Sequence, residues 1–216
     1  MKKIITSLLF LGATLVCSFS LAYAQFAETI ELYPKNPEPK SDVTLTFKSY
    51  SFDANTASLV WTVNGKKVLE GEGEVKLIIR TGDVGDTTTV MVRASTVSGF
   101  NIAQSITITP ASVMMMYESP KSYVPLLYEG RSLPGEGALV RVTAFPSIGD
   151  SGALVSPSRL SYTWYINDQL FKAVSGAGKQ SALIRLDYLQ SKNDIKVIVR
   201  SPAGNVAEKT ITIYPH

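Results

Sequence analysis

Short segments in which apolar and polar residues alternate run along most of the chain. Between 42 and 49, Val43, Leu45 and Phe47 share one face of an extended strand, and the polar residues between them share the other. This period of two is typical of strands that are buried on one side only. Turn residues separate the segments, and no stretch favours a helix. In the first half of the chain the pattern predicts seven strands, at 29–33, 42–49, 58–64, 66–69, 75–80, 88–95 and 102–109.

The second half of the chain repeats the first in the same order. LVWTVNG from Leu59 corresponds to YTWYIND from Tyr162, VMVRA from Val90 to VIVRS from Val197, and SITITP from Ser105 to TITIYP from Thr210. The offset stays between 103 and 107 residues, which is close to the roughly 100-residue length of an immunoglobulin-like sandwich. The repeat predicts seven more strands, at 113–117, 138–145, 159–167, 169–172, 181–186, 194–201 and 206–214. The chain is therefore expected to be all-β, with two tandem immunoglobulin-like antiparallel β-sandwiches.

One tryptophan occupies the same place in each repeat. Trp61 lies in phase with Leu59 and Val63, and Trp164 lies in the corresponding phase of the second repeat, so both are expected in the core. The alternative is that the two indoles stack on a sugar ring. The first tryptophan strand ends at Asn64-Gly65, a strong hairpin signal because a type I′ turn needs a positive φ at both central residues.

A tryptophan on the third strand followed by Asn-Gly or Asn-Asp resembles the immunoglobulin-like superfamily. The later Val-x-Val-Arg strand, glycine turn and Ile-Thr-Ile strand resemble the bacterial immunoglobulin-like and PKD-type modules of surface proteins, and this likeness covers nearly all of residues 28–215. More narrowly, WTVNGK from Trp61 and the stretch 117–146 resemble secreted bacterial proteins built from two such modules. The resemblance implies an architecture and export, and no chemistry.

The chain departs from these families in two ways. Neither tryptophan begins the Trp-x-Phe-Gly-Asp-Gly motif that is usual in PKD modules. No cysteine pair accompanies the tryptophan as in antibody-type domains, so Val and Leu are expected to fill that part of the core.

The N-terminus has the three regions of a secretory signal peptide. Lys2 and Lys3 precede an apolar run from 4 to 21, and Ala22-Tyr-Ala24 is a small-x-small cleavage motif. We expect a signal peptide at 1–24, one immunoglobulin-like domain at 25–111 and a second at 112–216, in a secreted or otherwise extracytoplasmic protein. The alternative is an uncleaved anchor, because the run is about as long as the ~18 residues of a membrane-spanning helix.

The residue inventory argues against several function classes. Removing the two N-terminal lysines leaves 19 basic and 18 acidic residues, and no basic run interleaved with aromatic residues points to nucleic acid. The single histidine is His216, and the single cysteine, Cys17, lies in the signal segment. Neither a Ser-His-Asp nor a Cys-His arrangement nor a zinc site can be assembled from these residues. We therefore expect no enzyme and no cofactor.

Calcium is the one metal that oxygen ligands alone could hold here. Acidic turns occur at 70–74, at 81–86 with Asp83 and Asp86, and at 149–152 with Asp150. None has the Asp-x-Asp-x-Asp spacing of a dedicated calcium loop. We interpret each as an ordinary turn, with a calcium site as the alternative.

The longest interruption of the strand pattern runs from 118 to 136, where the first repeat needs only 34–41. Loops of this length without regular structure are usually functional or disordered, and this one contains large side chains of the kinds found at interfaces. The candidate partner-binding residues are Tyr123, Leu126, Leu127, Tyr128 and Arg131. The alternative is that the segment covers a sheet edge or fills the domain junction.

The three methionines just before this segment, Met114 to Met116, allow two interpretations. Because methionine adapts to irregular gaps, we interpret them as packing at the domain junction. The alternative is a partner-binding surface.

Together these patterns predict an exported, non-enzymatic structural or adhesive protein that presents a protein-contact surface. Its partner would be a protein or glycan of the cell envelope, and it would meet the membrane only through the signal segment, if that stays uncleaved. The alternative is a carbohydrate-binding module, which would need exposed coplanar aromatic side chains. The residues available for that are Tyr50, Phe52, Tyr123 and Tyr128.

Signal-peptide cleavage after Ala24 is directly testable. The exported protein should begin at Gln25, because the cleavage motif ends at Ala24. Intact-mass measurement on protein recovered from outside the cytoplasm checks this. A mass that still includes Met1 would favour the anchored alternative.

Overall fold

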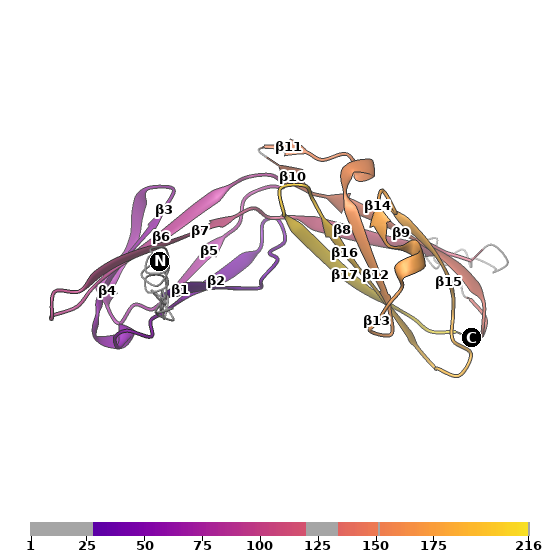
Figure 1. The fold of residues 1–216 in the computed structure, drawn as a ribbon, viewed down its shortest axis with the longest axis horizontal. Coiled ribbons are helices and arrows are strands. Elements are labelled where there is room, and N and C mark those ends of the chain that lie inside the picture. The colour runs from indigo at the N-terminus through magenta and orange to yellow at the C-terminus, as the bar shows by residue number, and fades with distance from the viewer. Residues whose placement is uncertain (1–27, 120–133, 151, 216) are drawn as a thin grey trace, which may run out of the picture.

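The computed structural model describes residues 28–119, 134–150 and 152–215. In this part of the chain the strands form two antiparallel β-sandwiches, which lie end to end with β7 leading into β8 between them (Figure 1). The first sandwich comprises β1 to β7 and the second comprises β8 to β17. The expected fold class of two tandem immunoglobulin-like sandwiches is confirmed.

The first sandwich packs a three-stranded sheet, in the order β1-β2-β5, on a four-stranded sheet in the order β4-β3-β6-β7. All pairs are antiparallel. A single 3-10 turn, η1 (Ala54–Thr56), leads into the third strand. The strands are β1 (Thr29–Tyr33), β2 (Asp42–Lys48), β3 (Ser58–Val63), β4 (Lys66–Glu72), β5 (Lys76–Arg80), β6 (Thr88–Ser95) and β7 (Asn101–Ile108).

The second sandwich repeats this order as β15-β9-β8 on β13-β12-β16-β17. The 3-10 turn η2 (Pro157–Arg159) matches η1. The main strands are β8 (Ser112–Glu118), β9 (Leu139–Ser147), β12 (Ser161–Ile166), β13 (Gln169–Leu170), β15 (Ser181–Arg185), β16 (Asn193–Arg200) and β17 (Val206–Ile213).

The second sandwich also has elements that the alternation did not predict. A small hairpin joins β10 (Gly149–Asp150) to β11 (Ala153–Leu154), and β14 (Gly176–Ala177) pairs with β12. The strand expected at 169–172 ends at Leu170, and the 3-10 turn η3 (Lys172–Val174) follows. The Ser175 hydroxyl accepts from the Trp164 N–H at 3.0 Å and donates to the Phe171 carbonyl at 2.8 Å. A side chain thus replaces the strand partner that would otherwise satisfy Trp164.

Each core is centred on its tryptophan. Trp61 and Trp164 are completely buried, which confirms their predicted place in the core. The Trp61 indole N–H donates to the Glu74 carbonyl at 2.7 Å, and the Trp164 indole N–H donates to the Lys179 carbonyl at 2.9 Å. In both sandwiches the accepting residue stands two positions before the strand that begins at Lys76 or Ser181. Each indole therefore bonds across the sandwich, from one sheet to the start of a strand in the other.

An asparagine closes the hairpin after each tryptophan strand. The Asn64 side-chain oxygen accepts from the Thr89 N–H at 2.9 Å, while the Asn64 N–H donates to the Thr89 carbonyl at 2.8 Å. Asn167 makes the same pair of bonds to Asp194, at 2.9 and 2.8 Å. Both asparagines have positive φ, 48° and 49°. The predicted turn at Asn64 is confirmed, and the side chain explains why asparagine occupies this place in both repeats.

The junction between the sandwiches is short and held by backbone contacts. Three residues separate Ile108 of β7 from Ser112 of β8, and the Ala111 N–H donates to the Pro37 carbonyl at 3.1 Å. Gly149 of the β10–β11 hairpin approaches Gly85 so closely that a Cβ on Gly149 would overlap the Gly85 Cα. Close backbone approach of this kind requires glycine. The hairpin that the alternation missed is thus part of the contact between the two sandwiches.

The expected signal peptide at 1–24 lies outside the described residues. Within the residues that the structure does describe, no helix has both the length and the apolar character of a membrane span.

The indole hydrogen bond should contribute measurably to stability. Trp61→Phe should lower the free energy of unfolding by about 1–3 kcal/mol, because it removes the part-buried hydrogen bond to the Glu74 carbonyl. Trp61→Ala should lower it by about 3–5 kcal/mol, since a large cavity is added. Urea unfolding followed by far-UV circular dichroism measures both.

Val97→Ala is the matched control for these two substitutions, because Val97 is fully exposed and its truncation should leave stability unchanged. A Trp61→Phe variant as stable as the parent would show that the indole bond contributes nothing.

Candidate functional site

The five residues predicted to bind a partner are not placed by the structure. Tyr123, Leu126, Leu127, Tyr128 and Arg131 lie outside the described residues. The structure describes what borders them: β8 ends at Glu118, and the next residue, Ser119, donates from its hydroxyl to the Leu139 carbonyl at 3.3 Å. The strands before and after this segment, β8 and β9, both belong to the sheet β15-β9-β8.

The outer face of that sheet carries five large apolar side chains. Along β8 and β9, residues such as Val113 and Val142 point into the core, so their neighbours point outward. The outward apolar residues are between 40% and 57% exposed. They are Met114, Met116, Leu139, Phe145 and Leu183, and we call them the apolar face.

The exposure of Met114 and Met116 corrects the interpretation of the three methionines as junction packing. Only Met115 contacts the core, where it is partly buried. Met114 and Met116 are more than half exposed on the outside of β8. The alternation of β8 decides this, because consecutive residues of a strand cannot all point inward. The alternative interpretation, a partner-binding surface, agrees with the observed exposure.

Strand register brings part of the apolar face together. Met114 lies directly opposite Phe145, and Met116 lies opposite Thr143. Leu183 lies opposite Arg141, and Arg141 forms an ion pair with Glu118 at 3.0 Å. The apolar face therefore has two parts, with Met114, Met116 and Phe145 on one side of the Glu118–Arg141 ion pair and Leu139 and Leu183 on the other.

The first sandwich provides an internal comparison. The Phe47 N–H donates to the Val75 carbonyl at 2.8 Å, and the Ala144 N–H donates to the Gln180 carbonyl at 3.0 Å. Because these two bonds are equivalent, Phe47 corresponds to Ala144 and Val75 corresponds to Gln180. The strand registers then give the correspondence for the remaining outward positions of the two sheets. In the order Met114, Met116, Leu139, Phe145 and Leu183, the equivalents are Thr29, Glu31, Asp42, Lys48 and Ile78.

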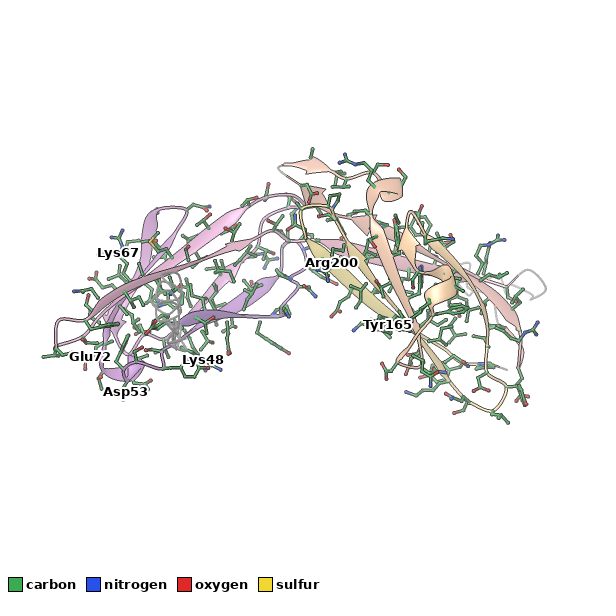
Figure 2. The ribbon with its side chains drawn as sticks, viewed as in Figure 1. Lys48, Asp53, Lys67, Glu72, Tyr165 and Arg200 are labelled. Atoms are coloured by element: carbon green, nitrogen blue, oxygen red, sulfur yellow. The ribbon has the colours of Figure 1, made fainter. Side chains whose placement is uncertain are left out.

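Four of these five positions are therefore polar or charged in the first sandwich. Glu31 and Lys48 even form an ion pair there, at 2.8 Å, and Figure 2 shows Lys48 on the first sandwich. The first face keeps two exposed large hydrophobic side chains, Tyr33 and Ile78, which flank Thr44 on the neighbouring strand. The apolar face is a property of the second sandwich and not of the shared scaffold.

The aromatic set considered for stacking on a sugar is not brought together in the described part of the chain. Phe52 packs between Phe47 and Phe100, with ring centroids 6.3 and 5.5 Å apart. Tyr50 is exposed and precedes by three residues Asp53, which Figure 2 labels on the first sandwich. Tyr123 and Tyr128 lie outside the described residues. The two indoles that were the other candidates are in the cores.

In two of the acidic turns the carboxylates bond to other residues of the chain. Asp83 forms an ion pair with Lys40 at 2.9 Å, and its N–H donates to the Asp86 carboxylate at 2.8 Å. The Asp150 carboxylate accepts from the Ser201 hydroxyl at 2.7 Å and from the Asn205 amide at 2.9 Å. Among the described residues, no three His, Cys, Asp or Glu side chains gather in a group that could hold a metal ion.

The Asp194 carboxyl, at the start of β16, has a lowered pKa. Hydrogen bonds from the Thr212 hydroxyl and from Lys192 lower the pKa of the Asp194 carboxyl. The Thr212 bond is 2.6 Å and the Lys192 ion pair is 3.1 Å. Asp194 is therefore ionised at neutral pH and serves as an anchor between β16 and β17.

No family model matches the chain, and no curated protein matches it in sequence. Solved structures with a similar arrangement include fibronectin(III)-like modules of CbhA from Clostridium thermocellum, with 12% identity, 88% of this chain and 94% of that chain covered, and a TM-score of 0.40. The N-terminal domains of the outer capsid protein Hoc of bacteriophage RB49 are also similar, with 11% identity, coverage of 88% and 59%, and a TM-score of 0.38. A third is a bacterial ice-binding adhesin of 1.5 MDa, with 10% identity, coverage of 88% and 64%, and a TM-score of 0.31. The fold assignment depends on the strand order and not on these weak likenesses.

Proposed function

We propose that this chain is an exported, non-enzymatic structural or adhesive protein of the cell surface, built from bacterial immunoglobulin-like and PKD-type modules at 25–111 and 112–216. In this proposal the second module presents a protein-contact surface, and the first holds it at a fixed distance. The observation that carries the proposal is the apolar face, which is present in one repeat and replaced at four of five positions in the other.

The chemistry of the apolar face supports a protein partner. Burying Met114, Met116 and Phe145 against a partner removes apolar surface from water, which is the main favourable contribution to most protein association. Methionine and aromatic residues are enriched at such interfaces, and methionine adapts its shape to a partner. The Glu118–Arg141 pair, which lies between the two parts of the apolar face, would contribute to orientation more than to affinity.

We propose that the segment containing Tyr123, Tyr128 and Arg131 extends this surface. It joins β8 to β9, the two strands that carry four residues of the apolar face. Tyrosine and arginine are common among residues that dominate binding energy. The proposed surface thus combines a rigid sheet face with a connection that begins and ends at that sheet.

The junction supports the spacing role. The Ala111–Pro37 hydrogen bond, the close approach of Gly149 to Gly85 and the ion pair between Lys209 and Glu38 at 3.9 Å all join the two sandwiches. Such contacts limit the hinge motion that a long flexible linker would allow. A partner bound on the second sandwich is then held at a defined distance from the first.

The proposal is tested by giving the second sandwich the residues of the first. Met116→Glu with Phe145→Lys introduces the residues that stand at the equivalent positions, Glu31 and Lys48. The double variant should fold as the parent does, because both positions face outward. Capture of the envelope partner by photo-crosslinking from position 114 should fall at least about tenfold, as expected when a central contact worth about 1.4 kcal/mol or more is lost.

Ile78→Thr is the matched control, since it removes the one apolar residue at the equivalent positions of the first sandwich. It should leave capture unchanged. If the double variant keeps its melting temperature and captures the same partner at the same yield, the apolar face is not the contact surface.

A further inference from the structure

A pocket of about 330 Å³ opens in the second sandwich, beyond the Leu139 end of the apolar face. It is lined by the turn after β12, by β13, by the end of β15 and by the start of β16. Because β16 runs from Asn193 to Arg200 and Figure 2 shows Arg200 beside the junction, the pocket lies at the opposite, outer end of the molecule. Its volume falls in the range of about 300–1,000 Å³ that is usual for small-molecule sites.

The pocket contains a completely buried amide that lacks a partner. Asn193 is 0% exposed, and its side-chain oxygen accepts from the Asp187 N–H at 3.0 Å. Its side-chain nitrogen has no hydrogen-bond partner among the described residues. A buried amide left in this way loses the hydration of its two N–H groups without replacement. An acceptor supplied from the pocket that Asn193 lines would satisfy it.

The other polar residues of the pocket offer both donors and acceptors. Gln169 and Gln190 contribute side-chain amides, and Asp187 contributes a carboxylate, whose Oδ1 accepts from the Leu189 N–H at 2.9 Å. The Arg185 guanidinium also lines the pocket and is oriented by a 3.2 Å hydrogen bond from Nη1 to the Gly137 carbonyl. One cation thus balances one anion, so a phosphate or carboxylate ligand would meet Asp187 and an ammonium ligand would meet Arg185.

Apolar side chains form the remaining part of the lining. Phe171 and Ile166 are partly buried against the core, and Leu170 is 46% exposed beside them. A neutral ring that carries hydroxyl groups on its edges and C–H groups on its faces matches this combination. Each hydroxyl group both donates and accepts, as the amides do, and the C–H groups can cover Phe171 and Leu170.

The pocket is not a general feature of the repeated scaffold. The equivalent asparagine bonds, from Asn64 to Thr89 and from Asn167 to Asp194, place Thr88 of the first repeat at the position of Asn193. The offset between the hairpins places Lys66 at the position of Gln169. Two of the amides therefore occur in the second sandwich only.

From these observations we infer that the outer-end pocket of the second sandwich is a binding site for a neutral saccharide, with the Asn193 amide donating to a sugar oxygen at its base. This inference goes beyond the proposed protein contact and does not depend on it. The two sites adjoin where Arg185 lies opposite Leu139, but the residues changed to test each one, Met116 and Phe145 for the contact and Gln190 and Gln169 for the pocket, are not shared between them. Loss of one function in an experiment is therefore distinguishable from loss of the other.

The test is a titration of the ¹⁵N-labelled mature chain, followed by NMR, with cellotetraose, xylotetraose, mannotetraose and chitotetraose as separate probes. At least one of them should shift the side-chain amide signals of Asn193 and Gln190 in a saturable manner. Gln190→Ala should weaken that binding about tenfold, the effect of losing one hydrogen bond to the ligand. Ser191→Ala, next to it and outside the pocket lining, should leave the affinity unchanged.

Gln169→Ala is a second variant, and it removes an exposed side chain that holds no described structural contact, so its effect on binding is not confounded by unfolding. Inorganic phosphate and an unstructured peptide are titrated in parallel. If none of the four tetrasaccharides shifts the Asn193 amide, or if only phosphate or the peptide does, the inference is wrong.

Discussion

The hydrogen bond from each buried indole to a carbonyl of the facing sheet fixes the relation between the two layers of each sandwich. Trp61 and Trp164 carry the largest side chains in their cores, and each bonds to the residue two positions before a strand of the other sheet. Immunoglobulin-type sandwiches often join their layers with a disulfide at this place, whereas the only cysteine here is Cys17, outside both sandwiches. The indole bond therefore supplies a directional link between layers whose facing side chains are mainly apolar.

Once the layers are fixed, the outward residues are free to differ. The same strand order, the same indole bond and the same asparagine at the hairpin occur in both sandwiches, yet their outer faces have different chemistry. Lys48 and Glu31 of the first sandwich correspond to Phe145 and Met116 of the second. The repeat thus separates residues that the fold needs from residues that it does not constrain, and the proposed contact surface belongs to the second group.

Much of this architecture could be predicted from the sequence, because alternation and the tryptophan phase are local signals. The strands of the first sandwich agree with their predicted limits to within a few residues. The β10–β11 hairpin could not be predicted, since its contact between Gly149 and Gly85 joins residues far apart in the chain. The exposure of Met114 and Met116 could have been predicted by placing Val113 and Met115 on the inward side of an alternating strand. A run of three methionines shows no apolar–polar alternation, so the sequence pattern did not indicate which of them face outward. The burial of the Asn193 amide depends on how the start of β16 packs against the connection that follows β15. The apolar–polar pattern of a single strand contains no information about such packing.

The central claim is that the second sandwich carries the contact and the first does not, and hydroxyl-radical footprinting tests it without changing a residue. Methionine is among the side chains most easily oxidised, and Met114, Met116 and Phe145 are all exposed in the isolated chain. In the cell envelope these residues should become several-fold less reactive than in the purified protein. Tyr33 and Ile78, exposed on the equivalent face of the first sandwich, should react equally in both samples. Equal protection of the two faces, or protection of Tyr33 and Ile78 alone, would contradict the account.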